Sequence, residues 1–367
     1  MSRAEARTQL AELVERFPDH ALAVAVKRKP WIKLFNWEFW PTVVLYFPVA
    51  FLHLYYGIRC GTPFFYTWVN PKIHHGGMFG ASKKDIHAQL PQEKMPKTLE
   101  LSPGDRFEEA VEWQQKSALN FPLIIKPHMG ARGNGIQMIY NKEELKANTE
   151  NLRFSASLQE YNTDPLELGV FYVRLPHWGK GKVTSLMVRK MTYVVGDGKS
   201  TVRKLIKQHD RLRLFTGPIF RLMEKEDLER IPEKGKKYFP IRIGNHNKGT
   251  MFLSADELIT PELEATFDEI SKSVPEFYFG RYDVKCRSWE DLEHGRFTII
   301  ELNGALAEPT AVYHPGASIA NFYSTVFRHH HWMGQIALSN KRNHKGVAFL
   351  KSWADLRRFQ RDSKSFE

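Results

Sequence analysis

The feature that most constrains the fold is a segment of alternating polar and apolar residues at 280–303, with the sequence GRYDVKCRSWEDLEHGRFTIIELN. Two strand-like pieces flank a polar turn at 290–295, and this pattern predicts an antiparallel hairpin. Side chains two residues apart in a strand share a face of the sheet. A register symmetric about Leu292 would therefore place two polar pairs on one face: Asp283 with Glu301, and Arg281 with Asn303.

This polar cluster has the chemistry of a divalent-metal site. Carboxylate and amide oxygens are hard ligands that suit Mg²⁺, which often binds through a few protein oxygens together with substrate phosphates. Glu301 follows residues 298–300 (Thr-Ile-Ile) and so emerges from an apolar strand. Burying a carboxylate there is costly unless a cation or hydrogen bonds compensate it. We predict a metal site with Asp283, Glu301 and Asn303 as ligands; the alternative is the ordinary polar face of a hairpin.

A glycine-bearing loop lies upstream, between strand-like segments at 122–126 and 136–140, and its glycines are Gly130, Gly133 and Gly135. Glycines let backbone N–H groups approach phosphate oxygens without interference from a Cβ atom. The glycines of P-loops and dinucleotide-binding motifs precede a helix, whereas this loop joins two strands, which favours a flap over a triphosphate. Lys126, at the end of an apolar strand, supports this interpretation. The alternative is a plain strand turn with a lysine that points to water.

Composition and cysteine content narrow the class of protein. The chain has 367 residues, 42% hydrophobic and 26% charged, which excludes a disordered chain, a collagen-like fibre and a small disulfide scaffold. Its 53 Lys and Arg against 41 Asp and Glu give a net charge of +12, which favours anionic partners. Cys60 and Cys286 are the only cysteines and fit a reducing cytosol. Strand-like and helix-like segments interleave without a regular βαβ period, so the predicted class is α+β.

The N-terminal part is aromatic and basic. A basic cluster (Lys27, Arg28, Lys29, Lys33) and three aromatic residues precede the run 41–58, which carries one histidine and no formal charge until Arg59. Three interpretations stay open: a short membrane span, an interfacial helix with aromatic rings at headgroup level, or a buried core helix. A single span would separate the remainder of the chain from cytoplasmic ATP. That consequence favours interfacial attachment over a simple span.

Together these motifs resemble the ATP-grasp superfamily over about residues 80–315. The segment 122–127 (PLIIKP) and the glycine loop resemble its phosphate lysine and flap, and 159–161 (QEY) resembles its adenine-side hinge. The triplets at 281–283 (RYD) and 301–303 (ELN) are similar to the arginine and metal ligands of D-alanine–D-alanine ligases. The segment 194–205 (VVGDGKSTVRKL) is close to a stretch of cyanophycin synthetase and of bifunctional glutathione synthetase.

The resemblance implies a fold, cofactors and roles. It implies the ATP-grasp fold, in which two α+β subdomains clasp ATP, and the use of ATP with Mg²⁺ or Mn²⁺. Arg281 would stabilise the tetrahedral intermediate and Lys126 would act beside it as a second catalytic residue, while the metal ligands would be those predicted above. The implied nucleotide-binding residues are Lys83 (preferred to Lys84), Lys126, Gly130, Gly133, Gly135, Glu160, Tyr161, Glu167 and Lys248.

The expected organisation follows from the same comparison. We expect an N-terminal helical, membrane-associated segment at 1–75, a linker with the small subdomain at 76–160, a large subdomain at 161–340, and a C-terminal surface helix or tail at 341–367. Two departures from the ligases stand out. The usual N-terminal α/β domain is not evident, and 304–310 (GALAEPT) differs from the small-residue Pro-Gly turn of D-alanine–D-alanine ligases. These departures indicate a different substrate.

The implied activity is ATP-dependent ligation of a carboxylate to an amine through an acyl phosphate, with release of ADP and phosphate. The alternatives are phosphoryl transfer to a hydroxyl group and a non-catalytic, membrane-associated nucleotide-binding protein. Expected partners are small carboxylates and amines, including amphiphilic ones, and an anionic membrane surface. No nucleic-acid recognition motif is present, so no nucleic-acid partner is expected. The expected location is cytoplasmic, at the inner face of the membrane. The histidines at 329–331 are expected to form a helix surface rather than a metal site.

Overall fold

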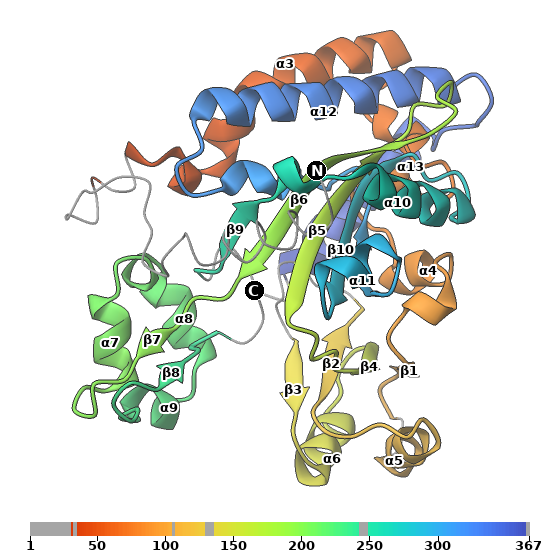
Figure 1. Ribbon diagram of the computed structural model, residues 1–367. Helices are drawn as coiled ribbons and strands as arrows, with labels where there is room; N and C mark the ends of the chain where they lie inside the picture. The colour runs from red at the N-terminus through yellow and green to blue at the C-terminus, as the bar shows by residue number, and fades with distance from the viewer. Residues whose placement is uncertain (1–30, 32–34, 105–106, 129–135, 242–248, 365–367) are drawn as a thin grey trace.

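The computed structural model describes residues 31, 35–104, 107–128, 136–241 and 249–364. Helices and strands follow one another irregularly, and two larger antiparallel sheets carry the fold (Figure 1). The α+β class predicted from the sequence is therefore confirmed.

The smaller sheet has four strands in the order β1-β4-β2-β3 and lies at the bottom of Figure 1. Its elements are β1 (Thr98–Leu101), α5 (Phe107–Lys116), β2 (Leu123–Pro127), β3 (Gln137–Ile139), α6 (Lys142–Glu150) and β4 (Ala156–Glu160). Leu123 and Ile125 of β2 pack with Leu145 of α6 in one buried cluster. Because side chains alternate along a strand, Ile124 and Lys126 belong to the other face of this sheet.

The larger sheet has five strands in the order β11-β10-β5-β6-β9. Its strands are β5 (Leu166–Val173), β6 (Lys182–Lys190), β9 (Met251–Ser254), β10 (Phe279–Cys286) and β11 (Thr298–Asn303). One face packs on α10 (Pro261–Ser273) and α11 (Trp289–Glu293) through residues such as Val170 and Tyr282. The alternating residues Phe171 and Phe279 face the opposite side, where they pack with Met333 and Ile336. Both faces of the sheet are therefore covered over part of its length.

A layer of helices covers the second face of the larger sheet and runs across the top of Figure 1. It consists of α3 (Thr42–Cys60) and α12 (Ile319–Asn340), which lie side by side, with η2 (Phe65–Trp68) beneath them and α13 (Phe349–Lys364) behind. Pro41 is the N-cap of α3, whereas Pro48 lies inside the helix. The prolines therefore do not divide the apolar run into two pieces.

A further small lobe lies at the lower left of Figure 1 and has its own buried cluster. It contains β7 (Val194–Val195), α7 (Val202–Gln208), α8 (Thr216–Leu222), α9 (Lys225–Glu229) and β8 (Lys237–Tyr238). Arg211 is fully buried here, and its Nη1 lies 3.4 Å from the carboxylate of Glu38. This ion pair ties the segment before α3 to the lobe.

The predicted hairpin register is confirmed where it matters most. Asp283 pairs with Glu301, and Arg281 pairs with Asn303. Beyond that point the predicted symmetry is wrong, because the short helix α11 takes the place of a simple turn and a bulge shifts the register after Asp283. The bulge lets Ile299 face the core while Glu301 faces the other side. The predicted domain boundaries at 75, 160 and 340 stay predictions.

Candidate active site

The centre of the site is the paired end of β10 and β11, on the face of the sheet opposite α10. Arg281 donates two hydrogen bonds to Asp283, from Nε to Oδ1 at 2.7 Å and from Nη2 to Oδ2 at 3.0 Å. Gly169 on β5 leaves room for this pair, because a Cβ atom there would lie 3.2 Å from Cδ of Arg281. The bidentate contact fixes the guanidinium beside the buried carboxyl group of Asp283.

Two lysines from separate parts of the chain converge on Glu301. Lys83, the first residue of α4 (Lys83–His87), places its Nζ 3.1 Å from Oε1 of Glu301. Lys126 comes from β2 of the smaller sheet and lies within electrostatic range of both Glu301 and Lys83. The two lysines predicted to hold phosphates therefore meet the predicted metal ligand where the two sheets approach each other.

The pKa values of these groups reflect their mutual charges. Burial lowers the pKa of Lys126 to about 8, and the carboxylate of Glu301 only partly offsets that effect. Burial alone would raise the pKa of Glu301, but the cations Lys83, Arg281 and Lys126 lower it to about 2. Glu301 is therefore ionised at neutral pH, whereas Lys126 begins to lose its proton slightly above neutrality.

The predicted nucleotide-binding residues Glu160, Tyr161 and Glu167 lie where β4 ends and β5 begins. Glu160 is the last residue of β4, and Tyr161 follows it with Lys285 Nζ 5.2 Å from the centre of its ring. Glu167 on β5 pairs with Lys285 in the strand register and forms an ion pair with Arg189 of β6. Tyr161 and Glu167 thus lie next to Lys285 on the strand that carries Asp283, whereas Glu160 pairs with Leu123 in the smaller sheet.

Three residues of this cluster were missed by the sequence analysis. Arg189 contacts Glu167, and its Nη2 also lies 3.7 Å from Oδ2 of Asp283. Lys285 donates to the carbonyl of residue 162 at 3.0 Å, and His87 lies close enough to Lys126 that burial and that cation hold its pKa near 4. Lys285 carried a readable signal, since it lies two residues after Asp283; Arg189 depends on a strand pairing that the sequence did not reveal.

Four predicted residues cannot be placed. Gly130, Gly133, Gly135 and Lys248 lie outside the described residues. The expected helix-surface role of the histidines at 329–331 is wrong for His329, which is buried. Its Nε2 lies 2.9 Å from Oγ1 of Thr184, and its ring packs against Phe171. Burial lowers the pKa of His329 to about 3.

The donor set fits a divalent metal and a polyanion. Asp283, Glu301 and Asn303 offer oxygen ligands from adjacent strands, and Nδ2 of the Asn303 amide has no hydrogen-bond partner among the described residues. The linked groups carry five positive and four negative charges, a surplus of 5 − 4 = +1, and they are Lys83, Lys126, Arg189, Arg281, Lys285, Glu167, Asp283, Glu301 and Glu308. An unbalanced cationic cluster around hard oxygen ligands suits Mg²⁺ together with bound phosphates.

Two antiparallel sheets thus meet at this site, one contributing Lys126 and the other the hairpin that carries Asp283 and Glu301. Solved structures that match this chain belong to the same ligase groups as its motifs. A bifunctional glutathione synthetase from Pasteurella multocida is 17% identical, and the match covers 64% of this chain and 34% of that one with a TM-score of 0.35. D-alanine–D-alanine ligase from Bacillus anthracis complexed with ATP is 13% identical, with coverages of 71% and 66% and a TM-score of 0.38. VanG D-Ala:D-Ser ligase from Enterococcus faecalis is 14% identical, with coverages of 73% and 62% and a TM-score of 0.38.

These likenesses concern the fold and are distant. This chain spans about one third of the glutathione synthetase and just under two thirds of the two other ligases. No protein-family model matches the sequence, and no curated protein matches it. Because their TM-scores are below 0.5, what can be said of this site rests on the chain's own strand register and on the convergence of Lys83, Lys126 and Glu301.

Proposed function

We propose that the protein is an ATP-dependent carboxylate–amine ligase. The observation that carries this proposal is the convergence of Lys126, Lys83 and the β10–β11 carboxylates at one point between the two sheets. A carboxylate is a poor electrophile because its hydroxide is a poor leaving group. In the first step, an oxygen of the substrate carboxylate attacks the γ-phosphorus of ATP, the bond between that phosphorus and ADP breaks, and an acyl phosphate forms. The amine nitrogen then attacks the acyl carbon, phosphate leaves, and the nitrogen loses a proton.

Each residue of the site would act by position and charge. Lys126 and Lys83 would hold phosphate oxygens, and Arg281 would stabilise the oxyanion of the tetrahedral intermediate. Asp283, Glu301 and Asn303 would hold Mg²⁺ or Mn²⁺, which when bound neutralises charge on the transferred phosphoryl group. Glu160, Tyr161 and Glu167 would contact the adenosine part. The roles of Gly130, Gly133, Gly135 and Lys248 stay as the resemblance implies them.

The deciding experiment measures ADP release from Mg-ATP with pooled amino acids and amphiphilic carboxylates, with and without hydroxylamine. A ligase gives ADP and, with hydroxylamine, a hydroxamate that mass spectrometry detects. A phosphotransferase gives ADP and a phosphorylated hydroxyl compound but no hydroxamate. ATP binding without turnover in every pool would favour the non-catalytic alternative, and AMP as the product would contradict the acyl-phosphate route.

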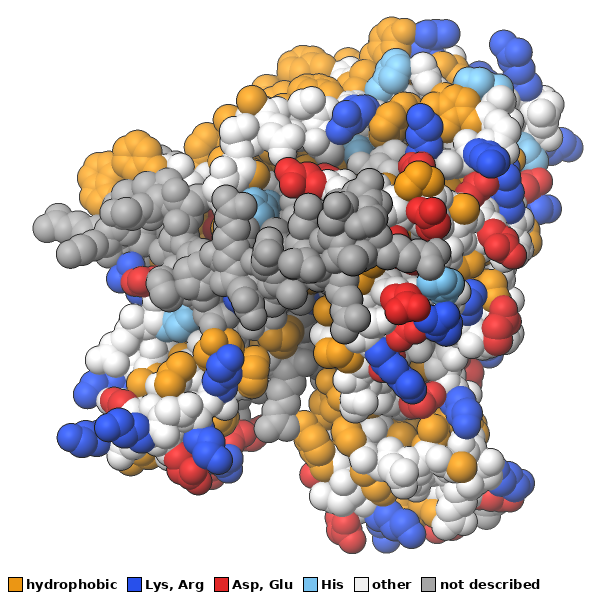
Figure 2. Space-filling model, in the orientation of Figure 1, with side chains coloured by type: hydrophobic (Ala, Val, Ile, Leu, Met, Phe, Trp, Pro, Cys, Tyr) orange, Lys and Arg blue, Asp and Glu red, His pale blue; other side chains and the backbone are white. Residues whose placement is uncertain are grey.

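We also propose that the exposed side of α3 rests on an anionic membrane surface. Figure 2 shows hydrophobic side chains along the upper edge of the molecule, where Figure 1 places α3. Neither α3 nor α12 contains an Asp or Glu, while Arg59 and Arg328 are exposed. The large exposed apolar residues of α3 are Val43, Val44, Phe47, Phe51, Leu54, Tyr55 and Ile58.

An interfacial position fits α3 better than a span. In the described part of the chain, α3 is the one helix with the length and apolar composition to cross a bilayer. However, its inner residues Leu45 and Val49 pack with Phe322 of α12, and Tyr56 Oη lies 2.7 Å from Nδ1 of His331. A spanning α3 would lose these contacts. An interfacial α3 keeps them and buries only its exposed side.

The same helix reaches the active site, which supports an amphiphilic substrate. Tyr46 of α3 hydrogen-bonds to Glu308, whose backbone carbonyl accepts a hydrogen bond from Nη1 of Arg281 at 3.2 Å. Two contacts thus connect the apolar surface with the residue proposed to stabilise the reaction intermediate. A substrate with an apolar tail could remain at the membrane while its polar end enters the site.

A further inference from the structure

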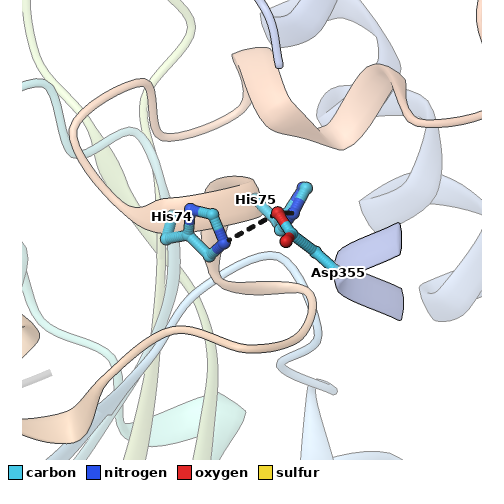
Figure 3. Close-up of side chains that lie close together, drawn as sticks. All are labelled: His74, His75 and Asp355. Atoms are coloured by element: carbon cyan, nitrogen blue, oxygen red, sulfur yellow. Dashed lines mark hydrogen bonds and ion pairs between the residues drawn. The ribbon is translucent and has the colours of Figure 1, made fainter. Parts of the chain in front are cut away.

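Two histidines and an aspartate converge where η3 (His74–Gly77) meets α13 (Figure 3). Nε2 of His75 lies 3.0 Å from Oδ2 of Asp355, and Nε2 of His74 lies 3.5 Å from the same oxygen. The three atoms all lie within 4.8 Å of one another. They come from positions about 280 residues apart, so the fold brings this group together.

We propose that His74, His75 and Asp355 form a binding site for a divalent transition-metal ion, with Zn²⁺ as the best fit. Two imidazoles and a carboxylate form a ligand set that Zn²⁺ accepts. Bonds of about 2.0–2.1 Å in a tetrahedral arrangement place neighbouring ligand atoms about 3.3–3.4 Å apart. The 3.0 and 3.5 Å separations bracket that value. A small rotation of the exposed His74 ring would complete the geometry.

The local structure holds the buried ligand in place. His75 is fully buried, and its ring stacks on Phe79 with the centroids 4.3 Å apart. The next residue, Gly76, has a carbonyl that accepts from Nδ2 of Asn70 at 3.0 Å, and a Cβ atom at Gly76 would lie 2.0 Å from the carbonyl oxygen of Tyr66. The backbone around His75 therefore has little freedom, and its ring is presented to Asp355 in one orientation.

A hydrogen bond between His75 and Asp355 accounts for only part of this arrangement. The side chain of His74 is 43% exposed and could turn towards water, yet its Nε2 points to the same carboxylate oxygen. Nδ1 of His75 has no hydrogen-bond partner among the described residues, so no partner there dictates which ring nitrogen carries the proton. Nε2 can then present a lone pair to an ion instead of a proton to Asp355.

The charge around the cluster selects the kind of ion. Lys351, one turn before Asp355 on α13, lies close enough to His75 to act on it electrostatically. A nearby ammonium group opposes a hard cation that is held mainly by charge, such as Mg²⁺. An ion that forms strong bonds to imidazole nitrogen tolerates it better. The partly exposed His74 and Asp355 leave room for water as the remaining ligand.

A bound ion would fasten α13 to the loop that supports the active site. The carbonyls of Gly76 and Gly77 accept hydrogen bonds from the backbone N–H groups of Ala305 (2.9 Å) and Leu306 (3.2 Å). These residues follow Asn303, one of the predicted Mg²⁺ ligands. The inferred role is therefore structural: the ion stabilises the junction of η3, α13 and the loop after Asn303.

The test uses the full-length protein, stripped with a chelator and titrated with Zn²⁺ or Co²⁺ in excess Mg²⁺, which competes for the proposed oxygen-rich site of Asp283, Glu301 and Asn303. The variants are His74→Ala and Asp355→Asn, and the control is His294→Ala, an exposed histidine on α11's C-terminal side. The wild type and the control should bind one ion per chain, with a visible Co²⁺ spectrum and a higher Tm after Zn²⁺ addition. Both variants should bind at least about tenfold more weakly.

His74→Ala keeps the hydrogen bond between His75 and Asp355. This variant should therefore fold as stably as the wild type when no metal is bound. Circular dichroism and the Tm without metal check this for each variant. If His74→Ala and Asp355→Asn fold normally and bind Zn²⁺ as tightly as the wild type, the ion lies elsewhere and the proposal is wrong. It is equally wrong if the folded wild type retains no ion at equimolar Zn²⁺.

Discussion

The active-site cluster and the helix pair α3–α12 differ in what is left unbalanced: net charge in the cluster and exposed apolar area in the helix pair. In the cluster each strand carboxylate has a cationic partner: Asp283 has Arg281, Glu301 has Lys83, and Glu167 has Arg189. What remains is a surplus of positive charge. In α3 and α12, by contrast, Arg59 and Arg328 are the only Lys, Arg, Asp or Glu residues, and what remains is an apolar surface exposed to solvent. A surplus of charge indicates an ionic ligand, whereas a surplus of apolar area indicates an apolar partner.

The first prediction removes the charge at the centre of the cluster. Glu301→Gln should lower ATP-dependent turnover by about 100- to 1,000-fold, because the amide can neither neutralise a metal ion nor orient Lys83. The matched control is Glu290→Gln on α11, an acidic residue of the same hairpin that is outside the cluster. Steady-state ADP release measures both. Turnover within threefold of the wild type for Glu301→Gln would show that the carboxylate hairpin is not the catalytic centre.

The hairpin was predictable because its information is local. The spacing of Arg281, Asp283, Glu301 and Asn303 within 23 residues set both the pairing and the shared face. The bulge after Asp283 was not predictable, because it depends on how α11 packs its Trp289 and Leu292 into the core. Local pattern thus determines which side chains pair, while packing determines where the ladder shifts.

The residues that the sequence analysis missed were not predictable, for a different reason. Arg189 reaches Asp283 only because β6 pairs with β5, which pairs with β10. His75 and Asp355 meet only because α13 returns to η3. Neither pairing leaves a signal in the spacing of the residues concerned. The N-terminal apolar run was readable as a helix candidate, but its one-sided burial follows from α12, which lies far along the chain.

The second prediction tests the apolar surface. Phe51→Glu should weaken binding to phosphatidylglycerol-containing vesicles by about 30-fold, because burying a phenylalanine contributes roughly 2 kcal/mol and a carboxylate is repelled by anionic lipid. Phe51 is 63% exposed and Ile231, at 52%, lies outside α3, so Ile231→Glu is the control. Flotation with the purified protein measures binding. Equal flotation of the two variants, or no wild-type binding, would exclude α3 as a membrane surface.

A substitution on the exposed side of α3 should not affect the chemistry of the active site. Phe51→Glu should leave turnover of a water-soluble substrate unchanged, because Phe51 lies on the exposed side of α3 and the link to the site runs through Tyr46. Its effect should appear only with a substrate presented in vesicles. Equal losses with both substrates would indicate that the change disturbs the fold or the site directly.

The third prediction concerns pH and is the smallest in magnitude. Burial lowers the pKa of Lys126 to about 8, so the free protein loses this cation as the pH rises through that value. Since kcat/KM reports the ionisation of the free enzyme, kcat/KM for ATP should fall about tenfold from pH 7 to pH 9. The sign is set by the ligand: a phosphate oxygen binds the protonated lysine, so deprotonation can only weaken binding.

Lys126→Arg separates this effect from other titrations. Arginine stays charged throughout the range, so its profile should be flat between pH 7 and pH 9 even if the different shape of the guanidinium lowers activity at every pH. Lys116→Arg, an exposed lysine at the end of α5, should keep the wild-type slope. If Lys126→Arg retained the tenfold fall, the titrating group would be another one. A flat wild-type profile would mean instead that the cluster's carboxylates, Glu301 above all, hold the Lys126 proton more strongly than burial expels it.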